Sequence, residues 1–497
     1  MQVNNILAWL GLAMAAAWVV HTRWLDPWRH RRGLRFPPGP PCLPILGNVL
    51  QLGRNPHKSL AELAKRYGPL MSLKLGTQFV GVVSSPEMAR EILQRQGLVF
   101  SMPFSAEAVC VLGHERMSMG LLSTASAQWR KLRRISKEHL FSPAALQASQ
   151  HLRQERLRKL AAHVSERCGA PMNVGEATFA TMSNLMFGTL FAIEIGNRRD
   201  LREHVNSLTR LAGAPNLADF FPLLAPFDPQ GLRRNLTYHL RTLMALIQTL
   251  IDQRLQARTA SDYHRTNDSL ETLLDIVQGN EYDLSIEEIK HMFVDLIIAG
   301  SDTSAATAEW AMVELLLHPD KLAKLKAELN NLLGDQTCIL QESDISKLPY
   351  LQATVKEVLR YHPAAPLLAP HVAKDETKIN GYVIPKHAKI FINAWAISRD
   401  PAIWNNPDRF EPERFLDNDI DFGGHHFNLI PFGSGRKICP GMPLASRMLH
   451  CMIATLCHNF DWKLQQGTES KQFQREDVFG LVLQKKNPLW AIPINKV

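Results

Sequence analysis

The segment from residue 431 to residue 441 carries the most informative chemistry of this sequence. It reads Pro-Phe-Gly-Ser-Gly-Arg-Lys-Ile-Cys-Pro-Gly, so that Phe432, Gly435 and Lys437 precede Cys439. Glycine allows the backbone to approach a flat ligand closely and to adopt positive φ angles. Cations and backbone N–H groups near a sulfur favour the thiolate, which is the form of cysteine that binds metal. The segment therefore predicts a metal-binding Cys439, and the alternative is a buried, inert cysteine.

A second polar segment interrupts a long apolar helical pattern. Ala-Gly-Ser-Asp-Thr-Ser at 299–304 lies in the middle of residues 285–317, which begin with a Ser-Ile-Glu-Glu capping box and end before Pro319. Such a helix would contain about 33 residues and measure roughly 50 Å. Four residues of low helix propensity in its interior predict a local distortion, with polar groups that face a cavity. A solvated polar patch is the alternative.

The order Phe-x-x-Gly-x-x-x-Cys-x-Gly resembles the cysteine-ligand loop of the cytochrome P-450 superfamily, the haem-thiolate monooxygenases. Residues 299–304 resemble the oxygen-binding segment of the same family. By this resemblance Cys439 is the axial ligand of the iron of haem b, and its thiolate favours O–O cleavage. Phe432 and Gly435 would also contact the haem. Thr303 would donate a hydrogen bond at the oxygen site, and Asp302 would relay protons from solvent.

The resemblance extends to residues that would hold the haem propionates. Trp129 and Arg133, one helical turn apart, are similar to a pair that the family uses for a propionate. Lys437 stands where the family usually has arginine, and His371 stands where a Pro-Arg pair normally follows the Glu-x-x-Arg helix. Lysine lacks the bidentate fork of arginine, and histidine can be neutral. We therefore expect haem to bind with a weaker hold on its propionates, so that Trp129 and Arg133 matter more.

Three further residues match a structural triad of the family. Glu357 and Arg360 lie three residues apart, on one face of an expected helix, and Arg414 follows in a Pro-Glu-Arg-Phe segment. By the resemblance they would form a buried triad that braces the cysteine loop. A buried carboxylate needs two charge-assisted partners to offset its desolvation.

The substrate pocket is expected to be apolar. The segments 219–224 and 227–234 are similar to those of plant terpenoid hydroxylases, such as the geraniol hydroxylases and the abietane-diterpene hydroxylases that include ferruginol synthase. The resemblance implies a lipophilic substrate, held by shape in an apolar site. The pocket would be built from the loop 101–122, the long helix, the turn 364–369 and the segment 478–483. The expected lining residues are Phe104, Phe293, Ile297, Ala299, Leu367 and Phe479.

These residues need a mainly helical body with a small β-sheet, which is also the fold that the resemblance implies. Alternating Val and Ile residues predict strands within 70–83 and 377–393. Residues 267–283 are polar and are predicted to be a loop. Apolar periodicity predicts helices over 59–67, 87–96, 146–164, 237–257, 285–317, 319–333 and 351–361.

The N-terminus predicts a membrane anchor. Residues 6–20 are uninterruptedly apolar and span about 23 Å, short of a typical bilayer core, and basic residues follow them. That charge order predicts a cytosolic C-terminal body, and it argues against a cleaved signal peptide, the alternative. We expect an anchor over 1–25, a basic and Pro-rich hinge over 26–42 that acts as a stiff spacer, and a haem-thiolate catalytic domain over 43–497. The endoplasmic reticulum membrane is the location that this organisation implies.

Composition and charge limit the partners. Seven irregularly spaced cysteines in 497 residues argue against a disulfide framework and for a reducing compartment. The net charge is +9, but the sequence contains no basic run interleaved with aromatic residues, so we do not expect nucleic acid as a partner. A basic patch near the cysteine loop would instead bind NADPH-cytochrome P-450 reductase, and NADPH would act only through that partner.

The leading hypothesis is a membrane-anchored monooxygenase that uses O₂ to oxidise a terpenoid. One alternative is a haem-thiolate isomerase or dehydratase that rearranges hydroperoxides without a reductase. Such enzymes usually lack the helix threonine, so Thr303 argues against this alternative. The other alternative is a haem-binding protein without turnover.

Overall fold

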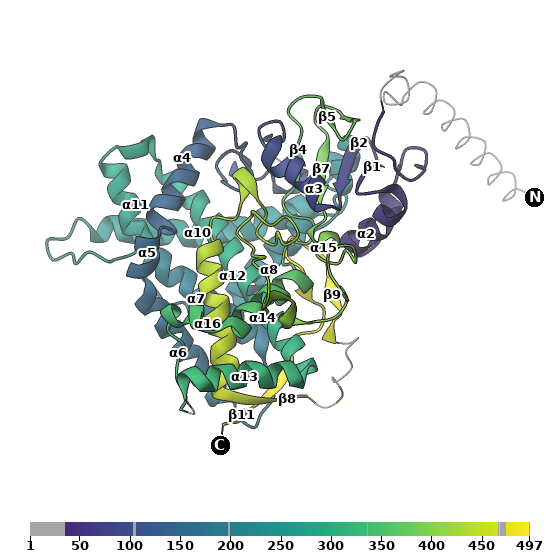
Figure 1. Ribbon diagram of the computed structural model, residues 1–497. Helices are drawn as coiled ribbons and strands as arrows, with labels where there is room; N and C mark the ends of the chain where they lie inside the picture. The colour runs from purple at the N-terminus through teal and green to yellow at the C-terminus, as the bar shows by residue number, and fades with distance from the viewer. Residues whose placement is uncertain are drawn as a thin grey trace, which may run out of the picture.

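The computed structural model describes residues 35–102, 106–196, 199–334, 336–465, 467 and 474–496. A helical region occupies most of the molecule, and the main β-sheet lies beside helix α2 at one side of it (Figure 1). The prediction of a mainly helical fold with small sheets is therefore confirmed. The principal helices are α2 (Pro56–Tyr67), α4 (Ala127–Ile135), α5 (Pro143–Ala148), α6 (Gln150–Ser165), α7 (Val174–Phe191), α8 (Arg199–Gly213), α10 (Leu232–Ala257), α11 (Ser269–Gln278), α12 (Ile286–Leu317), α13 (Pro319–Leu333), α14 (Pro349–Tyr361) and α16 (Met442–Asn459), and the short ones are α3 (Pro86–Arg90), α9 (Leu217–Phe220) and α15 (Ala394–Ile397).

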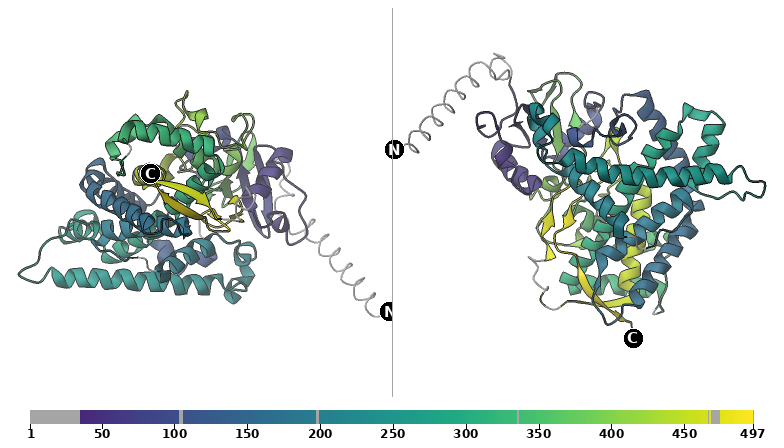
Figure 2. Two further views of the ribbon diagram at one scale, coloured as in Figure 1. Left: turned by 90° about the horizontal axis from the view of Figure 1, so that it is seen from below. Right: turned by 180° about the vertical axis from the view of Figure 1, so that it is seen from behind.

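Helix α12 runs through the middle of the helical region, and it packs against α7 and α16 (Figure 1). Its start is the predicted capping box. The Ser285 hydroxyl accepts the backbone N–H of Glu288 at 3.1 Å, and the Glu288 carboxylate accepts the backbone N–H of Ser285 at 3.0 Å. The helix ends before Pro319, as predicted. Helix α10 crosses the back of the molecule (Figure 2).

The polar segment 299–304 does not break α12, so the expected distortion does not interrupt the helix. Gly300 lies where α7 approaches most closely: a Cβ atom there would stand 2.8 Å from the sulfur of Met186. Glycine has a low helix propensity, but its lack of a side chain allows the two helices to pack closely here. The Thr303 hydroxyl donates to the carbonyl oxygen of Ala299 at 2.6 Å, which is the usual way for a helical threonine to satisfy its hydroxyl.

The main sheet has the strand order β1-β2-β7-β4. Strands β1 (Leu70–Leu75) and β2 (Gln78–Val83) form an antiparallel hairpin, and β7 (Lys389–Ile392) pairs with β2 in parallel. Strand β4 (His371–Val372) completes the sheet, with His371 opposite Ile390. The strands predicted within 70–83 and 377–393 are therefore confirmed. The small sheets join β3 (Met172–Asn173), β11 (Trp490–Asn495) and β8 (Phe460–Leu464); β5 (Thr377–Ile379) and β6 (Tyr382–Ile384); and β9 (Asp477–Val478) and β10 (Gln484–Lys485).

The prediction of a loop over 267–283 is wrong, because α11 occupies most of this segment. Asp268 caps the helix by accepting the backbone N–H of Glu271 at 2.8 Å. Leu270, Leu273 and Leu274 are buried in the main core. Polar composition concealed a short amphipathic helix whose three leucines already had helical spacing.

The Pro-rich segment, predicted to be a spacer, lies along β1. The backbone N–H of Ser72 donates to the carbonyl oxygen of Pro38 at 2.8 Å, and the Ser72 hydroxyl donates to that of Pro37 at 2.6 Å. The anchor predicted over 1–25 and the first part of the hinge lie outside the described residues. Within the part of the chain that the structure does describe, no helix is long and apolar enough to cross a membrane.

Candidate active site

The cysteine loop folds tightly and lies against a helical turn from the N-terminal part of the chain. The backbone N–H of Cys439 donates to the carbonyl oxygen of Phe432 at 3.0 Å, and Gly435 begins the short 3₁₀ turn η11 (Gly435–Lys437). Gly435 has φ of +66°, and a Cβ atom there would stand 2.0 Å from the carbonyl oxygen of Leu93, in the π-helical turn η3 (Glu91–Arg95). Only glycine fits this position without displacing one of the two segments.

Cys439 stands directly before α16 with its sulfur largely enclosed. Burial raises the pKa of the Cys439 thiol, and the backbone N–H groups of Gly441 and Met442, with the Arg133 guanidinium, act in the opposite direction but are weaker. Without a ligand, burial therefore outweighs the cation and the N–H groups that the sequence analysis expected to favour the thiolate. A coordinated metal cation would favour the thiolate, because a thiol that coordinates a metal is deprotonated.

Two basic side chains beside the loop lack a carboxylate partner among the described residues. The Arg133 guanidinium donates to the carbonyl oxygen of Ile438 at 2.6 Å. Burial lowers the pKa of Arg133 and of Lys437, so both cations are held in a site of low polarity. A ligand with carboxylate groups would pair with these cations and offset their desolvation. Together with the donor set around Cys439, these residues fit haem, whose propionates supply such groups.

His371 and Trp129 lie beside these cations. His371 is buried, and burial followed by the charge of Lys437 lowers the pKa of its imidazole to about 4. His371 is therefore neutral near pH 7, and it can offer a propionate a hydrogen bond but no charge. Trp129 is buried in the first turn of α4, which Ser126 caps, and the Arg436 guanidinium lies over its ring at 5.9 Å from the centroid.

The structure brings the three members of the expected triad together. The Arg360 guanidinium donates to both oxygens of Glu357, at 2.6 and 2.8 Å, and Arg414 donates to the same carboxylate at 3.1 Å. Arg360 and Glu357 are fully buried. Arg360 also donates to backbone carbonyls at 398, 407 and 409, in the segment that leads to the cysteine loop. The buried charges of the triad therefore have hydrogen-bond partners that offset their desolvation.

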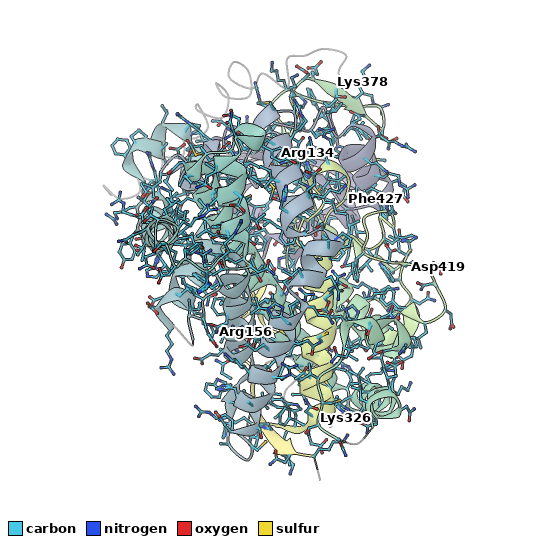
Figure 3. The ribbon with its side chains drawn as sticks, turned by 90° about the vertical axis from the view of Figure 1, so that its left-hand side faces the viewer. Arg134, Arg156, Lys326, Lys378, Asp419 and Phe427 are labelled. Atoms are coloured by element: carbon cyan, nitrogen blue, oxygen red, sulfur yellow. The ribbon has the colours of Figure 1, made fainter. Side chains whose placement is uncertain are left out.

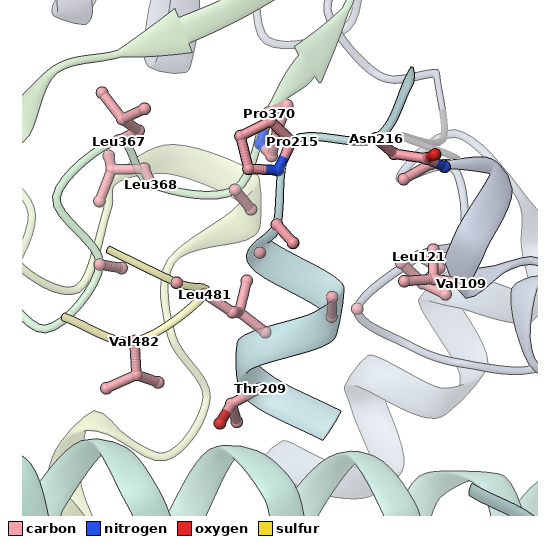
Figure 4. A pocket seen from close by; sticks show the side chains of 18 of the residues that line it. Val109, Leu121, Thr209, Pro215, Asn216, Leu367, Leu368, Pro370, Leu481 and Val482 are labelled. Carbon is pink, nitrogen blue, oxygen red and sulfur yellow. The ribbon is translucent and has the colours of Figure 1, made fainter. Parts of the chain in front are cut away.

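Thr303 and Asp302 point in different directions from α12. Thr303 lines the central cavity, whereas Asp302 is buried and faces α8 and β10. The Asp302 carboxylate accepts the Thr209 hydroxyl at 2.9 Å and the Gln484 amide at 2.7 Å. Burial raises the pKa of Asp302, and these two hydrogen bonds act against that shift. Thr209 of α8 also lines the cavity. Figure 4 shows its side chain directed toward the helix that runs along the bottom of the view.

The central cavity has a volume of about 560 Å³ and mostly apolar walls. Ala299, Leu367 and Phe479, which the sequence indicated as lining residues, border it, as do parts of the three loop segments that were expected to build it. The remaining walls were not expected from the sequence. They come from α2, β1, β2, β7, α9 and α10 and from the end of α8 with the segment that follows it, on which Figure 4 labels Pro215 and Asn216.

Two of the expected lining residues belong to the core instead. Phe293 and Ile297 are fully buried and do not border the cavity, and the Phe293 ring packs edge-on against Phe191 at 5.0 Å. The reason is the helical period. Thr303 and Ala299 are four residues apart on one face, whereas Ile297 lies two residues and Phe293 six residues before Ala299, so both face away from the cavity. Phe104 lies outside the described residues.

The basic patch expected near the cysteine loop is smaller than the sequence implied. Lys131 pairs with Glu288, Arg447 pairs with Glu342, and Lys437 is largely buried. Three of the cations that Figure 3 labels are also paired with carboxylates: Arg134 with Glu138, the buried Arg156 with Glu194, and Lys326 with Asp461. Arg130 and Arg436 remain exposed, and both donate to neighbouring backbone carbonyls, of Ala125 and Thr124.

A cysteine directly before α16, beside two cations that have no carboxylate partner among the described residues, is the arrangement expected of a haem-thiolate protein. Comparison with protein families agrees: residues 37–492 match the model described as Cytochrome P450. The chain belongs to this family, and it is an oxidoreductase of the monooxygenase class, as the sequence resemblance indicated. The family implies the haem-thiolate cofactor that these residues fit.

Several plant enzymes are similar over nearly the whole chain. The chain is 68% identical to carnosic acid synthase of Rosmarinus officinalis, covering 98% of both chains. It is 64% identical to 11-hydroxysugiol 20-monooxygenase of Salvia miltiorrhiza, over 99% of both. Ferruginol synthase of the same species is 48% identical, over 94% of this chain and 95% of its own.

Proposed function

We propose that the protein oxidises a plant terpenoid of the abietane kind, with O₂ and with electrons from NADPH-cytochrome P-450 reductase. The identity of 68% with carnosic acid synthase over almost the full length of both chains carries this proposal. The cavity supports it, because an apolar space of about 560 Å³ suits a lipophilic polycyclic molecule. The name of the 64% identical relative, 11-hydroxysugiol 20-monooxygenase, states one such oxidation for that protein.

Each polar residue of the site has a separate task in this proposal. Haem bound at Cys439 would supply dioxygen activation. Arg133, Lys437 and Trp129 would hold its propionates. Thr303 stands in the cavity wall, where its hydroxyl can offer a hydrogen bond to a bound oxygen species in exchange for its bond to Ala299.

Asp302 would store and deliver protons in this proposal. Because burial raises its pKa, its carboxyl group holds a proton more readily than a solvated aspartic acid does. Thr209 lines the cavity and its hydroxyl donates to this carboxyl group, so this residue can connect the two. Apolar walls elsewhere exclude water, which limits the loss of protons to other routes.

We also infer that residues 1–25 anchor the protein in the endoplasmic reticulum membrane with the catalytic body in the cytosol. The apolar run at 6–20 and the basic residues after it support this inference. The partner reductase would then act at the same membrane surface.

The proposed function can be tested in microsomes that contain the protein together with a plant reductase. Ferruginol and 11-hydroxysugiol are incubated with NADPH under ¹⁸O₂, with geraniol as the comparison substrate. We expect a product of either abietane that carries labelled oxygen, only when reductase and NADPH are both present. Conversion without reductase, or of geraniol alone, would contradict the proposal, and the first of these results would favour the hydroperoxide-rearranging alternative.

A further inference from the structure

A cluster of polar side chains interrupts the apolar wall of the cavity on the side of α12. The Asp295 carboxylate accepts the Ser118 hydroxyl at 2.7 Å, and it lies 3.2 Å from Nε2 of His114. The backbone N–H of Gly120 also points to it, at 3.4 Å. Asp295, His114 and Ser118 all line the cavity. None of them belongs to the haem-binding or proton-delivery groups described above.

The charge of Asp295 is only partly compensated by the protein. No lysine or arginine pairs with it among the residues that the structure describes, and its side chain keeps 16% of its surface exposed. Two other charged side chains of the described chain line the cavity, and they compensate each other: the charge of Lys389 acts on Asp219, and that of Asp219 acts on Lys389. A carboxylate has about four acceptor positions, so Asp295 can accept a further hydrogen bond from the cavity.

His291 fixes the orientation of His114. The two Nδ1 atoms lie 2.8 Å apart, so one of them must carry the proton that the other accepts. Nε2 of His114 faces Asp295, and Nε2 of His291 lies 3.3 Å from Glu287, so we assign a proton to Nε2 of His114 and treat the Nδ1 contact as one hydrogen bond shared by the two rings. Burial lowers the pKa of His291, in keeping with a neutral ring at this position. The pair therefore holds His114 as a fixed donor to Asp295.

The helical period places this carboxylate at a defined distance from Thr303. Asp295, Ala299 and Thr303 are spaced by four residues, so all three share the cavity face of α12. Eight residues of helix correspond to about 12 Å along the axis. A rigid polycyclic molecule lying along this face would have one end near Asp295 and the other near Thr303.

We propose that Asp295, held by Ser118 and His114, accepts a hydrogen bond from a hydroxyl group of the substrate and so orients a hydroxylated abietane diterpenoid with its opposite end toward Thr303. This inference rests on the proposed function. A neutral hydroxyl fits the site because it donates a hydrogen bond without bringing a second charge into an apolar cavity. A substrate carboxylate at the same place would be repelled by Asp295. The names ferruginol and 11-hydroxysugiol, in the names of similar enzymes, denote hydroxylated compounds.

The test compares two ligands and three forms of the haem-loaded protein. Ferruginol and its deoxy analogue, the same hydrocarbon without the hydroxyl group, are titrated into the unaltered protein, Asp295→Leu and Asp295→Asn, and binding is followed by absorbance and by tryptophan fluorescence. We expect the unaltered protein to bind ferruginol about tenfold more tightly than the deoxy analogue, the value of one hydrogen bond to a charged acceptor. Asp295→Leu should lose that preference while its Kd for the deoxy analogue stays within about twofold. Asp295→Asn keeps an acceptor oxygen and should retain part of the preference.

The controls separate this inference from the proposed function. Asp262→Leu makes the same substitution on the exposed loop after α10 and should leave both Kd values unchanged. The reduced, CO-treated spectrum shows whether each variant keeps its haem. Equal weakening of both ligands in Asp295→Leu, or no preference in the unaltered protein that still oxidises ferruginol, would overturn the inference alone. Failure of the unaltered protein to bind or oxidise either abietane would instead overturn the proposed function.

Discussion

At the scale of single residues, the site depends on groups that the protein buries before any ligand arrives. Arg133 and Lys437 are cations in a site of low polarity without carboxylate partners among the described residues, and desolvation raises the pKa of the partly exposed Cys439 thiol. The desolvation of these groups destabilises the folded protein without a ligand, and their interactions with haem would offset it. Haem binding should therefore contribute strongly to folding stability.

The Arg133→Ala substitution tests the hold on the propionates. Arg133 offers a guanidinium fork where Lys437 offers a point charge and His371 is neutral, so its loss should remove the strongest contact. We expect the variant to lose most of its haem during dilution and gel filtration, as measured by the Soret absorbance per protein. Lys437→Gln should lose less. Full haem retention in Arg133→Ala would show that the propionates are held by other residues.

His450 should make the protein sensitive to acid. Burial lowers the pKa of His450 to about 4 from its ordinary 6.5, so its contribution to stability is complete above pH 6.5 and is lost as the pH falls toward 4. The loss amounts to about 3 kcal/mol at most. His450→Gln should therefore show a smaller fall in Tm between pH 7 and pH 4.5. The exposed His151→Gln serves as the control, and an equal fall in all three proteins would exclude this role for His450.

At the scale of elements, close backbone approaches explain residues that propensity alone disfavours. Gly300 allows α7 to approach α12, and Gly435 allows the cysteine loop to lie on η3. The long helix and its capping box could be predicted because their signals are local. Helix α11 was missed because its polar residues outweighed three leucines in a short segment.

The contact between the cysteine loop and η3 can be tested with a matched pair of glycines. Gly433 and Gly435 both have positive φ, of +70° and +66°, but a Cβ on Gly433 would meet nothing within 4 Å, whereas one on Gly435 would meet the Leu93 carbonyl at 2.0 Å. Gly433→Ala should cost only the backbone strain, about 1–2 kcal/mol. Gly435→Ala should cost clearly more and should lower haem incorporation. Similar urea midpoints for the two variants would mean that the loop can move away from η3.

The cavity-lining residues of α12 could have been predicted from the helical period of the sequence. Once Thr303 is assigned to the cavity, the helical period assigns Ala299 and Asp295 to the same face. Apolar character alone suggested Phe293 and Ile297, which the period places on the core side. The cavity walls from β1, β2 and α8 depend on long-range packing, and no local pattern in those segments indicates it.

At the scale of the whole molecule, the face beside the cysteine loop offers few unpaired cations to a partner protein. Most cations near the cysteine loop are paired or buried, and Arg130 and Arg436 remain exposed beside each other, anchored to adjacent carbonyls. We expect these two arginines to dominate the attraction of an acidic reductase to this face.

Charge reversal at this place should weaken the partnership without altering the site. The double variant Arg130→Glu and Arg436→Glu should raise the KM for reductase several-fold at low salt, and the difference should shrink as salt screens it. Arg241→Glu, on the exposed side of α10, is the control. If the double variant matched the unaltered protein at low ionic strength, the reductase would have to bind elsewhere.

The ligation of iron by Cys439 is the claim on which the site, the cofactor and the proposed oxidation all depend. The most direct measurement is the absorption spectrum of the reduced, CO-treated protein, compared with that of Cys439→Ser. We predict the long-wavelength Soret band of thiolate ligation in the unaltered protein and its absence in the variant. The same band in both proteins, or its absence from a haem-containing unaltered protein, would contradict the account.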